Sequence, residues 1–153
     1  MTNLCCKVLQ ALEGKTLVTA ESLTGGGIGA ALTAVPGASA VYKGGVISYT
    51  NQVKQQVLCV PEDVLSRYGA VSEQTAAAMA AGVRKLLQAD VAVSVTGLAG
   101  PAGDEFGNPV GTVFIGIESA HTAVVRRFQF EGSRAQIRNQ TVAAALELIL
   151  EHV

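Results

Sequence analysis

The sequence predicts a single-domain α/β protein, an α/β/α sandwich built around a mixed β-sheet. Short apolar runs typical of buried strands alternate with segments of helical spacing, which indicates parallel strands joined by helices. Two alternating segments follow one another near the C-terminus and indicate an antiparallel hairpin in the same sheet. The chain has 153 residues, the length of one domain, so residues 1–153 are expected to share one fold.

The first three elements set the pattern of this fold. Apolar residues at helical spacing predict an amphipathic helix over residues 3–13, which Gly14 ends. A short strand is expected over residues 16–20, followed by a helix from Ile28 to Val35 that Pro36-Gly37 terminates. A run of glycines therefore lies where this strand turns into this helix.

The next elements carry Tyr49 and Lys54. A β-rich stretch over residues 44–49 predicts a strand that Tyr49 ends, and the apolar spacing of residues 51–58 predicts a helix. Lys54 then lies one helical turn beyond the strand. Residues 61–68 predict a further short helix with proline near its start.

A long helix and a buried strand follow. Ser72 opens an alanine-rich helix that runs to about Leu87. The nearly continuous apolar run over residues 91–95 is typical of a strand buried on both faces, and it leads into Thr96. Residues 101–109 are rich in Gly, Pro and Asp and are expected to be irregular.

The C-terminal part is expected to complete the sheet and to cover it. Residues 111–118 and 122–130 alternate like two strands joined by a hairpin around His121. Ser133 then begins a last helix that has a regular apolar face. We find no internal repeat, linker or low-complexity segment in the chain.

Composition limits the classes of partner. The chain carries a net charge of −1 and has a pI near 6.1, which gives no electrostatic reason to expect nucleic acid or an anionic membrane as a partner. Charged residues make up only 15% of the chain, whereas roughly 25% is usual. Part of the surface is therefore expected to be covered by another copy, in a homodimer or larger homo-oligomer.

Cysteine usage and the absence of long apolar runs predict a cytoplasmic chain. Cys5, Cys6 and Cys59 are odd in number and form no CxxC motif, which disfavours a disulfide framework and a zinc site. The N-terminus lacks the pattern of a signal peptide, and no apolar run reaches the roughly 20 residues that span a bilayer. A soluble, reduced protein without a membrane partner is expected.

The segment Thr19–Gly27 holds the most informative residues. It places Ser22 and a glycine run at a strand-to-helix junction, where unpaired backbone N–H groups can hold a phosphate or stabilise an oxyanion beside a nucleophile. Ser, Thr and Gly are also common helix caps, so simple capping by Ser22 remains an alternative at this stage.

Ser22, Tyr49 and Lys54 form a workable set for acyl transfer. A serine needs a neighbour that takes its proton, and a lysine of lowered pKa can do so while a tyrosine relays the proton or orients the groups. The alternative is that Tyr49 is a strand aromatic with a solvated hydroxyl and that Lys54 is a solvated helix residue.

Other reactive groups are sparse. His121 lies in a predicted hairpin turn and His152 near the C-terminus, so neither is a convincing triad base, and no His, Asp or Glu spacing resembles a metal site. Glu21 adjoins Ser22 and could act as an acid or base or hold the loop. Asp104 and Glu105 lie in the irregular loop, where solvated carboxylates are the ordinary case.

A phosphate could still be bound without a standard motif. The glycine run follows neither the GK[ST] nor the GxGxxG order, which argues against a P-loop NTPase and a Rossmann dehydrogenase. The glycine run, the loop Thr96–Pro101, and Arg134 with Arg138 one turn apart could together clamp one small phosphorylated ligand. A solvated helix face is the alternative for both arginines.

Seven short blocks stand in order along residues 4–150. They are Ala20-Glu21-Ser22-Leu23-Thr24-Gly25-Gly26, Pro36-Gly37-Ala38-Ser39, Gly45-Val46-Ile47-Ser48-Tyr49 with Lys54, Gly69-Ala70-Val71-Ser72, Thr96-Gly97-Leu98-Ala99-Gly100-Pro101, Val110-Gly111-Thr112-Val113, and Gly132-Ser133-Arg134 with Arg138. In this order and spacing the chain resembles the CinA C-terminal domain family, in its stand-alone form, the PncC-type nicotinamide-nucleotide amidohydrolases.

The resemblance implies hydrolysis of the carboxamide of nicotinamide mononucleotide (NMN) to nicotinate mononucleotide and ammonia, a salvage step in pyridine nucleotide metabolism that needs no cofactor. Ser22 would be the nucleophile, Lys54 its general base and Tyr49 the hydroxyl that supports proton transfer. Backbone N–H groups near Thr24, Gly25 and Gly26 would stabilise the oxyanion. The residues implied to bind substrate are Glu21, Thr24, Gly25, Gly26, Thr96, Gly97, Ala99, Gly100 and Arg134.

A non-catalytic function stays open beside this one. The same pocket could bind a pyridine nucleotide or a related phosphorylated ligand in a competence-associated interaction module, with Ser22 only capping its helix. Leu98 stands where the family usually has Ile, a volume-conserving change, and the loop over residues 102–108 varies in the family. The stand-alone form lacks the N-terminal domain of full-length CinA proteins, so a pyrophosphatase activity tied to that domain is not expected.

Overall fold

The computed structural model describes residues 1–153 and contains one five-stranded mixed sheet. Its strands, in the order β2-β1-β3-β4-β5, are β2 (Tyr42–Ile47), β1 (Leu17–Glu21), β3 (Val91–Gly97), β4 (Thr112–Glu118) and β5 (Ala123–Gln129). The first three strands are parallel to one another, and β4 and β5 are antiparallel additions. The mixed sheet expected from the sequence is thereby confirmed.

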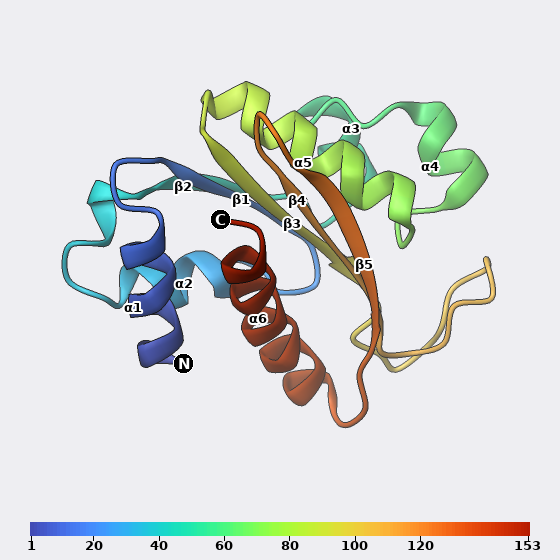
Figure 1. Cartoon of the computed structure of the whole chain (residues 1–153). Coiled ribbons are helices and arrows are strands. Elements are labelled where there is room, and N and C mark those ends of the chain that lie inside the picture. The colour runs from blue at the N-terminus through green and yellow to red at the C-terminus, as the bar shows by residue number, and fades with distance from the viewer.

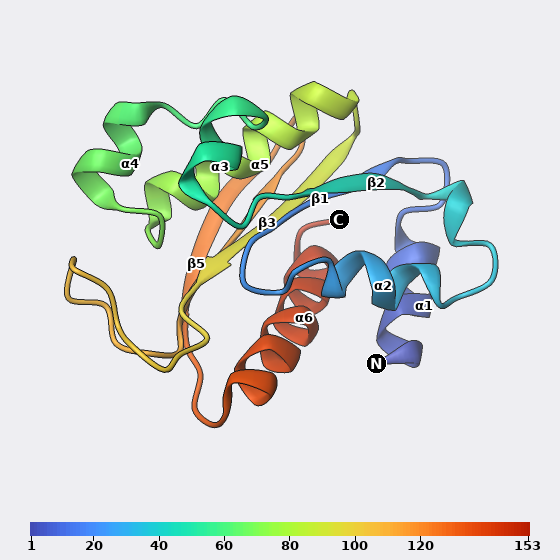
Figure 2. The same cartoon turned by 180° about the vertical axis from the view of Figure 1, so that it is seen from behind.

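Helices cover both faces of the sheet (Figure 1). One layer consists of α1 (Thr2–Ala11), α2 (Gly27–Thr33) and α6 (Arg134–Glu151), and the other of α3 (Asn51–Gln56), α4 (Glu62–Tyr68) and α5 (Glu73–Leu87). A short 3-10 helix, η1 (Ala38–Ala40), leads into β2. The view from behind shows the same two layers, with α3 next to the β2 side of the sheet (Figure 2). No helix combines the length and the apolar character needed to cross a bilayer.

Two hydrophobic cores fill the spaces between the three layers. The larger contains 22 buried residues, among them Val93 and Val95, and includes residues of α1, α2 and α6. The smaller contains 10 buried residues, among them Ala92, and includes residues of α4 and α5. Because successive side chains of β3 point to opposite faces, this central strand contributes to both cores, which explains its continuous apolar run.

The serine starts predicted for the last two long helices are confirmed, whereas several other boundaries differ by one or two residues, among them the end of β2. Ser72 and Ser133 are the N-cap residues of α5 and α6, and Ser133 forms a capping box with Gln136. β2, however, ends at Ile47, so Tyr49 does not end a strand as predicted. The Ser48 N–H still donates to the Glu21 carbonyl, but the Ser48 carbonyl accepts from the Lys54 side chain, which ends the strand pairing.

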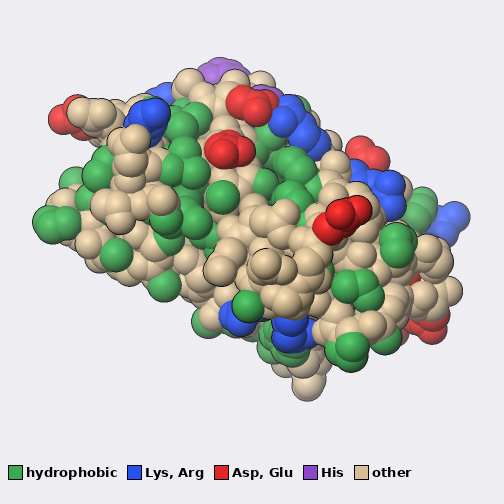
Figure 3. Space-filling view, turned by 90° about the horizontal axis from the view of Figure 1, so that it is seen from below, with side chains coloured by type: hydrophobic (Ala, Val, Ile, Leu, Met, Phe, Trp, Pro, Cys, Tyr) green, Lys and Arg blue, Asp and Glu red, His purple; other side chains and the backbone are tan.

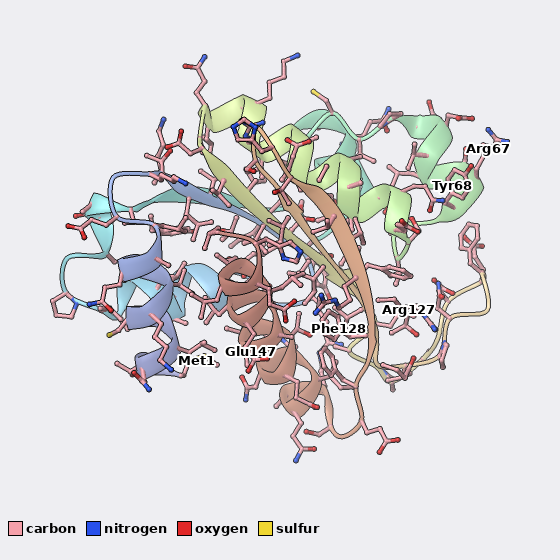
Figure 4. The ribbon with its side chains drawn as sticks, in the orientation of Figure 1. Met1, Arg67, Tyr68, Arg127, Phe128 and Glu147 are labelled. Carbon is pink, nitrogen blue, oxygen red and sulfur yellow. The ribbon has the colours of Figure 1, made fainter.

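The irregular loop over residues 101–109 is held by its own carboxylate. Asp104 accepts hydrogen bonds from the N–H groups of Phe106 and Asn108 and from the Asn108 side-chain amide, which also donates to the Val71 carbonyl. The tip of the loop lies beside the end of α4, where the Arg67 guanidinium stacks 5.7 Å from the Tyr68 ring centroid (Figure 4). The loop is thus fastened to the segment that follows α4.

Candidate functional site

The carboxyl ends of the parallel strands border a cavity of about 320 Å³. This is the edge at which open parallel sheets usually bind ligands. The residues that line the cavity are Ser22, Leu23, Tyr49, Lys54, Ala70, Val71, Thr96, Gly97, Leu98, Ala99, Gly100, Ala102 and Arg134. The structure therefore gathers Ser22, Tyr49 and Lys54 around one space, together with the Thr96–Gly100 loop and Arg134.

Ser22 directly follows β1 and does not cap a helix. Its N–H donates to the Val95 carbonyl, which ties it to β3, and its Oγ lies 3.1 Å from Lys54 Nζ. The N-cap of α2 is Gly26, and no side chain caps that position. The capping alternative for Ser22 is therefore wrong, because the chain makes a turn through Gly25 and Gly26, both with positive φ, before α2 begins.

Lys54 is a buried amine, with only 1% of its surface exposed. Its Nζ donates to the Ser48 carbonyl at 2.7 Å and to the Tyr49 carbonyl at 3.4 Å, in addition to its contact with Ser22 Oγ. Burial lowers the pKa of the Lys54 ammonium from its ordinary value of 10.5 to about 8, because the charged form loses hydration. The alternative of a solvated helix lysine is therefore wrong.

The three partners of Lys54 suit both of its protonation states, because an ammonium can donate to all three and a neutral amine can donate to the two carbonyls. A neutral amine has two N–H groups and one lone pair. When the two N–H groups donate to the Ser48 and Tyr49 carbonyls, the lone pair is left for the Ser22 hydroxyl. This arrangement can take the proton from Ser22 Oγ and return it to a leaving group.

Tyr49 reaches the cavity from its rim. Its side chain lines the cavity but is 58% exposed, and its hydroxyl accepts a hydrogen bond of 3.1 Å from Arg134 Nη2. The hydroxyl makes no hydrogen bond to Ser22 or Lys54. Arg134 also donates from Nη1 to the Gly100 carbonyl, so it joins the Tyr49 side and the Gly100 side of the rim.

The Glu21 side chain binds the first N–H groups of α2. Its carboxylate, 2% exposed, accepts hydrogen bonds from the N–H groups of Ile28 and Gly29 and from the hydroxyls of Thr19 and Thr24. It does not line the cavity. The helix start that the sequence offered as a phosphate site is therefore filled by the protein's own carboxylate, and Glu21 is placed to hold the loop after Ser22.

The glycine run contributes fewer free N–H groups than expected. Gly25 was predicted to offer its N–H to an oxyanion, but this N–H donates to the Ser22 carbonyl at 3.1 Å. The N–H groups of Leu23, Thr24 and Gly26 have no partner within the chain, and of these residues only Leu23 lines the cavity. The predicted substrate contacts of Thr24, Gly25 and Gly26 are not part of the cavity wall.

The second loop lies where the sequence placed it. Thr96, Gly97, Ala99 and Gly100 all line the cavity, and the N–H groups of Ala99 and Gly100 have no partner within the chain. The Thr96 hydroxyl donates to the Ala70 carbonyl at 2.7 Å, so it joins β3 to the lining segment that contains Ala70 and Val71. Two unpaired N–H groups are therefore available on this side.

The remaining candidates lie elsewhere. His121 and His152 do not line the cavity, and neither do Asp104 and Glu105. No group of three or more His, Cys, Asp and Glu side chains is arranged to hold a metal ion. Arg138, paired with Arg134 in the sequence prediction of a phosphate clamp, instead donates to the carbonyls of Leu23 and Thr24.

Sequence reasoning missed the groups that act through the backbone. The Ser48 carbonyl that holds Lys54 has no signature in the sequence. The capping role of Glu21 had a signal that could have been used, because a carboxylate at the end of a fully buried strand needs donors, and the nearest unpaired donors are the first N–H groups of the next helix. Ala70 and Val71 line the cavity because of how their segment packs in the fold, and neither residue type signals such a position in the sequence.

The family model and the curated relatives that match this chain all belong to one family. A family model described as the CinA C-terminal domain matches residues 1–153. A CinA-like protein of Thermotoga neapolitana is 46% identical over 140 residues, which are 91% of this chain and 34% of that protein. A CinA-like protein of Parasynechococcus marenigrum is 48% identical over 149 residues, which are 95% of this chain and 36% of that protein. The chain spans about a third of the length of the curated relatives it matches.

Solved structures give the same result. A competence-damaged protein (CinA) superfamily protein from Escherichia coli is 35% identical, with a TM-score of 0.97 over 99% of this chain and 90% of that one. A CinA superfamily protein from Klebsiella pneumoniae is 36% identical, with a TM-score of 0.95 over 98% of this chain and 95% of that one. By sequence, fold and extent of the match, the chain belongs to the CinA C-terminal domain family.

Proposed function

We propose that this protein is a cytoplasmic amidohydrolase that converts NMN to nicotinate mononucleotide and ammonia in pyridine nucleotide salvage. The observation that carries the proposal is the contact between Ser22 Oγ and Lys54, a buried amine of lowered pKa that, once neutral, can donate to its two carbonyl partners and accept from the Ser22 hydroxyl. The names of the relatives refer to competence and damage and to no reaction. The substrate therefore comes from the motif resemblance, and the reaction type comes from the site.

The proposed reaction has two halves. Ser22 Oγ attacks the amide carbon while neutral Lys54 takes the hydroxyl proton, and the resulting ammonium gives that proton to the leaving nitrogen as the C–N bond breaks and ammonia departs. Water then attacks the ester on Ser22 and Lys54 takes one water proton, which returns to Ser22 Oγ as the ester bond breaks. The product leaves as the carboxylic acid and ionises by giving its remaining proton to solvent. No co-reactant other than water is needed.

Negative charge on the amide oxygen needs donors close to Ser22. The Leu23 N–H is the first candidate, because Leu23 directly follows the nucleophile and lines the cavity with its N–H unpaired. The Thr24 N–H is the second candidate, since it is also unpaired. Each such donor is worth a factor of about 10² to 10³ in comparable enzymes.

The charge of the cavity favours an anionic substrate. Arg134 is its permanent cation, Lys54 adds a second positive charge only while it is protonated, and no carboxylate lines the cavity. With the carboxamide at Ser22, the ribose and phosphate would lie toward Arg134 and the free N–H groups of Ala99 and Gly100. In this proposal Tyr49 and Arg134 bind the substrate at the rim, and Thr96 and Gly97 shape the wall between the two ends.

A homodimer or larger homo-oligomer is part of the proposal. Ile47, the last residue of the edge strand β2, and Tyr49, two residues further on, are both more than half exposed. On the face seen from below, hydrophobic side chains gather mainly over the half that carries α1, and charged side chains are scattered (Figure 3). Sedimentation equilibrium measures the state, and a monomer at all concentrations would remove this part of the proposal.

Release of ammonia from NMN tests the proposed reaction. The wild-type chain should release ammonia, Ser22→Ala should release none while retaining its fold, and Lys54→Met should lower kcat by several orders of magnitude. Lys43→Met is the matched control, because Lys43 is an exposed lysine of the neighbouring strand β2 and should keep full activity. Near-normal turnover by Ser22→Ala would reject Ser22 as the nucleophile.

A non-catalytic nucleotide-binding module is the second candidate. It is favoured by the same pair of cations, Lys54 and Arg134, since they would suit an anion whether or not it reacts. Calorimetric binding of NMN without any release of ammonia would replace the amidohydrolase proposal by this one.

A further inference from the structure

Arg138 contacts the backbone of the segment that follows Ser22. Its Nε donates to the Leu23 carbonyl at 2.9 Å and its Nη2 donates to the Thr24 carbonyl at 3.2 Å. Arg138 does not line the cavity, whereas Arg134, one turn earlier on α6, does. The two arginines therefore have different surroundings, although the sequence pairs them.

The Arg138 contact fixes the direction of one N–H group. In a planar trans peptide the carbonyl and the following N–H point in opposite directions. Because the Leu23 carbonyl is turned toward Arg138 on α6, the Thr24 N–H is directed away from α6. Lys54 reaches Ser22 from α3, which lies in the helix layer opposite α6 (Figure 1). The Thr24 N–H is thus turned away from Arg138, and no group of the chain accepts a hydrogen bond from it.

The rest of the segment is fixed by other contacts. Glu21 binds the N–H groups of Ile28 and Gly29 at the start of α2, and the Ser22 carbonyl accepts from the Gly25 N–H. The Leu23 carbonyl has only Arg138 as a side-chain partner. A guanidinium stays charged at every physiological pH and holds two carbonyls at once, and its charge polarises the peptide bond, which makes the N–H a stronger donor.

We propose that Arg138 is a positioning residue, which holds the Leu23 and Thr24 carbonyls so that the Leu23 N–H, which lines the cavity, and the adjoining Thr24 N–H are fixed as donors to the oxyanion formed at Ser22. The inference rests on the proposed function in one respect, since it requires Ser22 to be the nucleophile. It assigns to Arg138 a role in the reaction without contact with the substrate.

Two measurements on the full chain test this role. The first is the steady-state release of ammonia from NMN. The second is the rate at which a fluorophosphonate labels Ser22, where the Ser22 oxygen forms a bond to phosphorus, fluoride leaves, and the phosphonyl oxygen occupies the position of the oxyanion. Labelling needs no nucleotide, so it reports on the loop and on Lys54 whether or not NMN is the substrate. Mass spectrometry identifies the labelled residue.

Arg138→Ala should lower kcat and the labelling rate by at least about tenfold, because small displacements of catalytic groups have effects of this size or larger. The KM for NMN should change less than about twofold, since Arg138 does not line the cavity. Arg138→Lys should recover part of both rates, because an ammonium can still hold one of the carbonyls. Asn139→Ala, the exposed neighbour on α6, is the matched control and should leave both rates unchanged.

The outcomes separate this inference from the proposed function. A raised KM with normal kcat and labelling would assign Arg138 to ligand binding and overturn the inference, as would unchanged rates in Arg138→Ala. If the wild type labels at Ser22 but releases no ammonia, the proposed hydrolysis fails while the labelling rate of the Arg138 variants still decides the inference. If the wild type neither labels at Ser22 nor releases ammonia, both are rejected.

Discussion

Lys54 Nζ lies 3.1 Å from Ser22 Oγ although the two residues are 32 positions apart in the chain. The pairing of β1 with β2 brings them together, because the strands run parallel and both end at the cavity. Ser22 follows β1 directly. Lys54 lies in α3, and its side chain contacts the carbonyls of Ser48 and Tyr49 in the loop that follows β2. The contact therefore depends on strand register as well as on the side chains.

The pH dependence of turnover should follow Lys54. Since burial lowers the Lys54 pKa to about 8, kcat/KM should rise with pH and level off above this value, as the base becomes neutral. A pH profile between 6 and about 10 measures it. A rate that falls as pH rises through this range would be incompatible with Lys54 acting as the base.

Stability should depend on pH through the same residue. Between about pH 8 and 10.5 the unfolded chain keeps the Lys54 proton and the folded chain has lost it, so the free energy of unfolding should rise with pH. The rise attributable to Lys54 is up to about 3 kcal/mol. Urea unfolding of the wild type and of Lys54→Met across this window isolates the effect, and two parallel curves would contradict it.

Ser48→Ala should leave turnover intact. Ser48 holds Lys54 by its backbone carbonyl, which alanine keeps, while its buried hydroxyl has no hydrogen-bond partner. Removing an unpaired buried hydroxyl should leave stability unchanged or raise it by about 1 kcal/mol. Thermal unfolding and ammonia release measure both quantities, and a large loss of kcat would assign the hydroxyl a function of its own.

Tyr49→Phe should weaken substrate binding more than it slows the reaction. The Tyr49 hydroxyl contacts Arg134 at the rim and neither Ser22 nor Lys54, so its loss should raise KM by about 3- to 10-fold through the freed guanidinium. Steady-state kinetics with NMN separate KM from kcat. A fall in kcat of more than about 100-fold would instead support the proton-transfer role that the family resemblance implies for Tyr49.

Gly69→Ala should loosen the loop over residues 101–109. Gly69 has a φ of +82°, and an added Cβ would lie 2.6 Å from the Phe106 ring. The ring must therefore move, and limited proteolysis should cut the loop faster. Gly14→Ala is the control, since Gly14 has the same φ of +82° but no atom lies within 4 Å of an added Cβ. Equal cleavage in both variants would show that Phe106 does not fasten the loop.

The order of elements could be predicted from periodicity alone, and some of the site could not. The continuous apolar run of β3 and the serine caps of α5 and α6 are local signals, so they appear in the sequence as they do in the structure. The Lys54 partners are two backbone carbonyls, and any residue type supplies a carbonyl. Nothing in the spacing of the side chains could indicate them.

Arg134 and Arg138 on α6 also have partners that could not be predicted from the sequence. Spacing by one turn correctly places Arg134 and Arg138 on one side of the helix, but one faces the rim of the cavity and the other the backbone after Ser22. Their different partners depend on which segments pack beside α6, the Gly100 loop at Arg134 and the turn after Ser22 at Arg138. These are tertiary features that side-chain spacing does not encode.

Glu21 and Ser22 are neighbours, but substitutions at the two positions should affect different properties of the protein, stability at Glu21 and turnover at Ser22. Replacing Glu21 by Gln should cost about 1–3 kcal/mol of stability, since an amide cannot accept from all four donors, whereas Ser22→Ala should leave the folded population unchanged. A mutational scan that records cellular abundance separately from turnover should therefore find position 21 intolerant in both measurements and position 22 intolerant only in turnover. In this chain the residue that secures the fold and the residue proposed to carry the reaction share a peptide bond.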